Sequence, residues 1–93
     1  MSNNEVLNAA ISHYGDLQKT VAMEEMAELI KELSKDIRGT GDPMHIAEEI
    51  ADTEIMLAQL KLIYGIHADV ARYKNEKIER LAKRIADEEE IAK

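Results

Sequence analysis

Apolar residues recur at intervals of three and four along nearly the whole chain, the spacing that places side chains on one face of an α-helix. In the first segment, residues 4–14, the apolar residues at helical spacing are Val6, Leu7, Ala10, Ile11 and Tyr14. In the second segment, residues 16–37, the apolar stripe consists of Ala22, Met23, Met26, Leu29, Ile30, Leu33 and Ile37. The pattern predicts two helices separated at Gly15, with Asn3 or Asn4 and Asp16 as N-cap candidates. The apolar stripe of the second helix is expected to face the core.

Residues 39–43 interrupt the pattern with two glycines, Asp42 and Pro43. Asp42 is an N-cap candidate for a third helix, and proline is favoured at the first helical position. This helix is expected over residues 43–64, ending at Gly65, and a fourth from residue 68 to the end of the chain. Because no alternating β pattern and no linker is present, we predict one all-α domain, residues 1–93, with a four-helix bundle arrangement and antiparallel neighbours.

The third predicted helix is apolar on two sides. One arc consists of Ile46, Ile50, Thr53, Leu57, Leu60 and Tyr64, and on a helical wheel Glu49 falls inside this arc and Asp52 at its edge. The opposite line consists of Ala47, Ala51, Ile55, Ala58 and Leu62. A helix with two apolar sides needs two partners. Either another subunit or the short first helix covers the second line, and the sequence leaves both open.

The composition of the chain argues against several classes of protein. A net charge of −7 argues against general affinity for DNA or RNA, which requires a basic surface. Without cysteine the chain has no disulfide, thiolate zinc site or cysteine nucleophile. It shows neither a signal-like start nor an apolar run of membrane-spanning length. We therefore expect a soluble cytoplasmic protein that binds no nucleic acid and no membrane.

Two acidic clusters, residues 24–28 and 48–52, lie on the second and third predicted helices. Acidic helix residues are most often a solvated surface, but Glu49 falls inside an apolar arc. Glu25 and Glu28, like Glu49 and Asp52, are three residues apart and share a helix face. If the two helices lie side by side, their carboxylates repel, and the cluster must take up protons or bind cations. Oxygen ligands without cysteine favour Mg²⁺, or alternatively Mn²⁺.

The arrangement Glu24-Glu25-x-x-Glu28, twenty intervening residues, then Glu49-x-x-Asp52 resembles the E-E-x-x-E…E-x-x-D signature of MazG-like, all-α nucleoside triphosphate pyrophosphohydrolases. The resemblance extends over residues 17–85. It implies that Glu25, Glu28, Glu49 and Asp52 bind magnesium and that Glu24 or Glu32 is an outer-shell or base candidate. It also implies hydrolysis of a nucleoside or deoxynucleoside triphosphate to the monophosphate and pyrophosphate by a homodimer or homotetramer.

Basic residues follow on the fourth predicted helix. Lys74, Lys77 and Arg80 are candidates for binding the substrate phosphates, because Lys77 and Arg80 are three residues apart on one helix face. Members of the family carry a similar basic cluster on their last helix. The alternative is a solvated basic face that pairs with neighbouring acids.

Two other functions stay open. A phosphoribosyl-ATP pyrophosphohydrolase has the same fold and a similar acidic arrangement, but here Asp52 is followed by Thr53-Glu54-Ile55-Met56 rather than by that family's Asp-Leu-Leu-Tyr-His type of run. We rank it second. A non-catalytic oligomeric adaptor with acidic helices that bind a basic partner is the third possibility.

Overall fold

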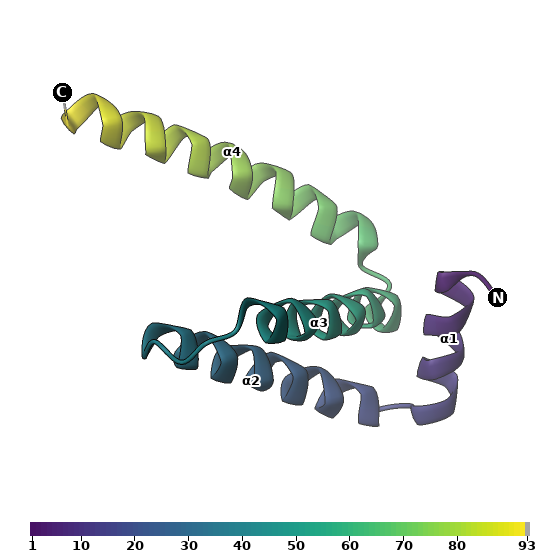
Figure 1. Ribbon diagram of the computed structural model, residues 1–93. Coiled ribbons are helices and arrows are strands. Elements are labelled where there is room, and N and C mark those ends of the chain that lie inside the picture. Colours follow the sequence, from purple (N-terminus) through teal and green to yellow (C-terminus); the bar gives the residue numbers. More distant parts are fainter. Residues whose placement is uncertain (93) are drawn as a thin grey trace.

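The computed structural model describes residues 1–92, which form four α-helices and no strand (Figure 1). They are α1 (Asn3–Tyr14), α2 (Leu17–Ile37), α3 (Pro43–Tyr64) and α4 (His67–Ala92). The all-α prediction is confirmed, and every helix boundary tested lies within about one residue of its predicted position, inside the usual uncertainty of helix ends. None of the described helices is both long and apolar enough to cross a membrane.

The helix ends show which predicted caps form. Asp42 accepts a hydrogen bond from the Met44 amide at 2.9 Å and caps α3 as predicted. The cap of α1 is Ser2 rather than Asn3 or Asn4, because Ser2 and Glu5 complete a reciprocal capping box. Asp16 occupies the N-cap position of α2 as predicted, but it does not cap the helix with its side chain. Its backbone is already helical, and its carboxylate lies 3.6 Å from the Lys19 ammonium instead of accepting a capping hydrogen bond.

The turn between α2 and α3 is tightly specified. Gly39 has a φ of 84°, and its amide and that of Thr40 donate to the carbonyls of Asp36 and Lys35, both at 3.0 Å. This pattern is a Schellman motif, which closes the last turn of a helix. A Cβ on Gly41 would lie only 2.5 Å from the Cα of Asp36, so the chain passes there without room for a side chain. The motif sends α3 back along α2 as an antiparallel hairpin (Figure 1).

The interface of this hairpin is partly polar. Its buried apolar residues are Ala22 and Met56. Beside them the Gln18 amide donates to the Gln59 side-chain oxygen at 2.7 Å, and both residues are almost fully buried. Because a buried amide without a partner is costly, this pair favours one alignment of the two helices. In that alignment Gln18 lies opposite Gln59.

The faces that meet differ from the prediction. The apolar stripe expected to form the core face of α2 is largely exposed, with Met23 62%, Ile30 67% and Ile37 87% accessible. On α3 the residues of the apolar arc that stay exposed are Ile50, Leu57 and Tyr64. The close turn fixes how the two helices face one another, so α2 meets α3 with the neighbouring strip that carries the acids. Several large apolar side chains of both stripes are left exposed, although Ala22 of the α2 stripe and Thr53 of the α3 arc are buried in the interface.

The second apolar line of α3 lies against α1. Val6 and Leu7 of α1 face Ala51, Ile55 and Ala58 across a shallow groove. Of the two partners that the sequence left open, the short first helix is therefore the one found within residues 1–92. It covers the line only in part, because Ile55 is still 49% exposed.

Helix α4 packs against little of the rest of the chain. After Gly65, which has a φ of 64°, it approaches only α3 among the described helices and extends away from the hairpin (Figure 1). The radius of gyration is 17.2 Å, against about 12 Å for a compact chain of this length. The four helices therefore do not close into a bundle within one chain. The apolar side chains left exposed on α4 include Tyr73, Ile78, Leu81 and Ile85.

Candidate functional site

Three carboxylates from two helices converge at the middle of the hairpin. One oxygen of each of Glu25, Glu49 and Asp52 lies within 4.8 Å of the other two. Glu25 comes from α2, and Glu49 and Asp52 are three residues apart on α3. The Thr53 hydroxyl lies 3.5 Å from the Glu25 carbonyl oxygen and marks the level at which the helices meet. The close turn and the buried glutamine pair thus bring two separate sequence clusters to one place.

The environment of the cluster disfavours negative charge. Glu25 and Glu49 are half-buried and Asp52 is exposed. Burial raises the pKa of Glu25, and the charge of Asp52 and a hydrogen bond with it raise that pKa further. Burial likewise raises the pKa of Glu49, with further contributions from the charges of Asp52 and Glu25. Both carboxylates therefore hold a proton, or accept a cation, more readily than ordinary surface glutamates.

One carboxylate oxygen of the cluster lacks a partner. Oε2 of Glu49 is buried and makes no hydrogen bond within residues 1–92. Buried polar atoms nearly always have a hydrogen-bond partner, so an exception calls for an explanation. Converging carboxylate oxygens, one of them unpaired, are a donor set of the kind that Mg²⁺ and Mn²⁺ bind. Glu25, Glu49 and Asp52 are the residues that fit such a cation.

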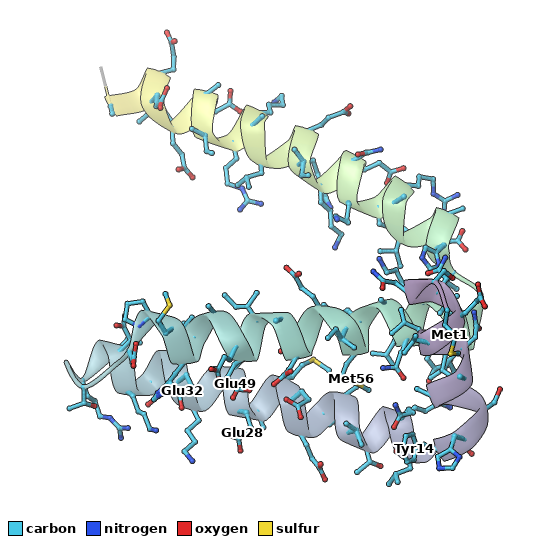
Figure 2. All side chains as sticks on the ribbon, turned by 45° about the vertical axis from the view of Figure 1, so that its right-hand side comes forward. Met1, Tyr14, Glu28, Glu32, Glu49 and Met56 are labelled. Carbon is cyan, nitrogen blue, oxygen red and sulfur yellow. The ribbon has the colours of Figure 1, made fainter. Side chains whose placement is uncertain are left out.

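The other predicted acids surround this group. Glu28 is exposed and lies outside the group of three, although its charge contributes to the raised pKa of both Glu25 and Glu49. Glu24 is exposed, and its charge contributes to the raised pKa of Glu25. Glu32 is buried on the side of α2 that meets α3, and its charge contributes to the raised pKa of Glu49 (Figure 2). The structure thus joins three of the four predicted ligands and leaves Glu28 at the edge.

The predicted basic residues lie elsewhere. Lys74, Lys77 and Arg80 are exposed on α4, and in the described part of the chain none of them forms an ion pair. Lys74 lies beside Leu57 and Lys61, near the turn into α4. The fold of a single chain therefore does not bring these side chains to the carboxylates, because α4 points away from the hairpin.

One basic residue at the edge of the cluster was not singled out from the sequence. The ammonium of Lys35 lies 3.2 Å from Oε1 of Glu32. The signal was available, since a Glu and a Lys three residues apart on a helix pair readily. What the sequence did not indicate is that this Glu is buried.

Comparison of the chain with known protein families, with curated proteins and with solved structures gave no match.

Proposed function

We propose that this protein hydrolyses a nucleoside or deoxynucleoside triphosphate to the monophosphate and pyrophosphate in a magnesium-dependent reaction. The observation that carries the proposal is the convergence of Glu25, Glu49 and Asp52, whose oxygens lie within 4.8 Å of one another although they come from two helices. Here two of the three carboxylates are half-buried with raised pKa values, and one buried oxygen has no partner within residues 1–92. The resemblance of the two acidic motifs to those of MazG-like pyrophosphohydrolases points to the same chemistry.

Each side chain has a role in this reaction. Glu25, Glu49 and Asp52 would hold the cation, and the exposed Glu28 at the edge of the cluster would be a further ligand candidate. Magnesium held there would supply neutralisation of phosphate charge and activation of a water for attack. Glu24 is exposed next to Glu25 and is available to accept the proton of the attacking water. Over the pH range in which Glu25 and Glu49 titrate, which their raised pKa values move upward, cation binding would release protons and strengthen as the pH rises.

A second copy of the chain supplies what one chain lacks. Residues 67–84 of α4 carry six basic and three acidic side chains, whereas residues 17–64 of the hairpin carry ten acidic and five basic ones. Both α2 and α4 also expose apolar stripes. Opposite charge and unpartnered apolar faces suit packing of α4 from one copy against the hairpin of another, as a symmetric homodimer or a homotetramer built from it. Lys74 and Lys77 lie within the apolar stripe of α4, so they would face the partner's carboxylates and bind the substrate phosphates there. Arg80 flanks them.

The test is pyrophosphate release from a panel of ribo- and deoxyribonucleoside triphosphates, each with magnesium and with EDTA. Phosphoribosyl-ATP belongs in the same panel. The expected result is magnesium-dependent release from one or a few triphosphates, with no release in EDTA. Release from phosphoribosyl-ATP alone would assign the related reaction, and no release from any compound would favour the non-catalytic adaptor.

A further inference from the structure

The connection between α3 and α4 is Gly65-Ile66, and both of these residues are bound into helix ends. Gly65 has a φ of 64°, and its amide donates to the Leu62 carbonyl at 3.3 Å. The Ile66 amide donates to the Lys61 carbonyl at 3.0 Å, which completes a Schellman motif at the end of α3. The Ile66 carbonyl in turn accepts from the Val70 amide at 2.9 Å and begins the hydrogen bonds of α4. The ends of both helices therefore share one residue, and no residue between them is left as a flexible linker.

Apolar side chains line the inside of this corner. Leu57 and Leu60 of α3 border one hollow together with Ile66 and Val70, and all of them except Leu57 are half-buried. A hydrophobic contact across the helix end commonly accompanies a Schellman motif. Turning α4 to a new direction would separate these side chains and return apolar surface to water, which is unfavourable. Hydrogen bonds and packing thus both determine the direction in which α4 leaves α3 (Figure 1).

Two lysines border the same corner. Lys61 of α3 and Lys74 of α4 line the hollow from the two helices. Neither of them forms an ion pair within residues 1–92. Folding α4 back along α3 would bring these two positive charges toward each other, and their repulsion grows as water between the helices is displaced. The charges at the corner therefore oppose closure of α4 on its own chain, as the backbone and the packing do.

We propose that residues 65–66 form a rigid elbow that holds α4 away from its own hairpin, so that a second copy of the chain, and not the chain itself, covers the apolar stripe of α4. The inference rests on the proposed assembly, in which α4 of one copy packs on the hairpin of another. Short connections of fixed geometry favour such an exchange of elements between protomers. A second copy also fits by charge, because basic residues 67–84 would meet the acidic hairpin. The elbow makes the basic side chains of α4 available to the carboxylates only in the assembled protein.

The experiment inserts Gly-Ser-Gly-Ser between Ile66 and His67, which separates the two helix ends that Ile66 joins. The control chain carries the same insert at its C-terminus. Mass is measured by sedimentation velocity over a range of protein concentrations, and the radius of gyration by small-angle X-ray scattering. We expect the wild type and the control to sediment as a dimer or tetramer, and the insertion variant as a monomer at the same concentrations. Because its α4 can then reach its own hairpin, the radius of gyration should be about 12 Å, as for a compact chain, rather than 17.2 Å.

The outcomes separate this inference from the proposed function. An insertion variant with the mass of the wild type would overturn the elbow and leave the proposed assembly intact. A monomeric insertion variant that stays extended would also overturn it, because α4 would then not fit its own hairpin. A monomeric wild type would overturn both the elbow and the assembly, and this result does not depend on the folding of a variant. Circular dichroism checks that the insertion variant keeps its helices, and pyrophosphate release tests the carboxylate chemistry separately.

Discussion

The buried hydrogen bond between Gln18 and Gln59 offers a quantitative test of how the hairpin is aligned. Gln18 is 6% exposed and Gln59 is 3% exposed, and the bond is 2.7 Å long. In Gln59→Leu the amide of Gln18 stays buried but loses its acceptor. The Gln59 amide, which lies 3.4 Å from the sulfur of Met56, is removed as well. Leucine is similar in volume to glutamine, so the change leaves little cavity.

The expected loss of stability follows from the unpaired amide. A buried donor without a partner costs about 1–3 kcal/mol, whereas replacing both partners by apolar groups of similar shape is nearly neutral. Gln59→Leu should therefore lower the free energy of unfolding by about 1–3 kcal/mol. The double variant Gln18→Leu/Gln59→Leu should recover most of this loss. In a domain of this size each kcal/mol shifts the melting temperature by about 4–8 °C.

The assay is urea unfolding of the wild type, both single variants and the double variant, followed by circular dichroism. The four proteins form a double-mutant cycle that isolates the coupling between the two side chains. Protein concentration must be equal throughout, because the homodimer or homotetramer proposed above would make the apparent stability depend on concentration. If the single variants are as stable as the wild type, or if their effects simply add in the double variant, the glutamine pair does not fix the alignment of α2 and α3.

Three further predictions concern charge, assembly and the turn. The pKa of Glu25 is raised above its ordinary value of 4.5 in the folded chain, so at a pH below 4.5 its carboxyl group is neutral in the folded and the unfolded chain alike. The folded chain holds this proton more tightly, which stabilises it. As the pH rises through the raised pKa, the proton is lost from the folded chain and this stabilisation is lost with it. In EDTA, Glu25→Gln should therefore be more stable than the wild type near neutral pH and about equal to it in acid, as measured by urea unfolding at each pH. If Lys77 acts on the partner's carboxylates, mixing inactive Asp52→Asn chains with inactive Lys77→Ala chains should restore part of the activity in the pyrophosphate assay. Gly41→Ala should cost about 1–3 kcal/mol in urea unfolding, because its Cβ would meet the backbone of Asp36.

Each of these predictions has a clear contradicting result. A stability difference between wild type and Glu25→Gln that does not change with pH would mean that Glu25 has no raised pKa. Mixtures that stay inactive after unfolding and joint refolding would place Lys77 on its own chain's site, or outside any site. A Gly41→Ala chain as stable as the exposed control Ser34→Ala would show that the turn can yield at Asp36.

The sequence predicted the helices well because their signals are local. Each of these signals determines the structure of only the few residues around it. They are the spacing of the apolar residues, the glycines at positions 39 and 65, and the Asp42 cap. The sequence did not predict which faces of α2 and α3 meet. The stripe through Met23 and Ile30 is the more apolar face of α2, yet the strip that meets α3 carries Gln18 and Glu25. That choice depends on the close turn between α2 and α3 and on how the side chains of the two helices fit together, which helical periodicity does not encode.

The candidate site could be predicted only as far as it depends on spacing within one helix. Spacing of three residues correctly placed Glu49 and Asp52 on one face, and the structure brings Glu25 to them. It could not show that Glu28 points outward, because that depends on the rotation of α2 against α3. The burial of Glu32 likewise depends on the neighbouring helix.

The most direct test of the proposed chemistry compares Asp52→Asn with Glu48→Gln in the pyrophosphate assay. Both variants lose one carboxylate charge from α3, but only Asp52 lies in the cluster with Glu25 and Glu49. On a triphosphate that the wild type hydrolyses with magnesium, we expect Asp52→Asn to lose pyrophosphate release while its helical content is kept, and Glu48→Gln to release pyrophosphate like the wild type. Full activity of Asp52→Asn, or no activity of the wild type on any triphosphate, would contradict the proposal that these carboxylates form the active centre of a pyrophosphohydrolase.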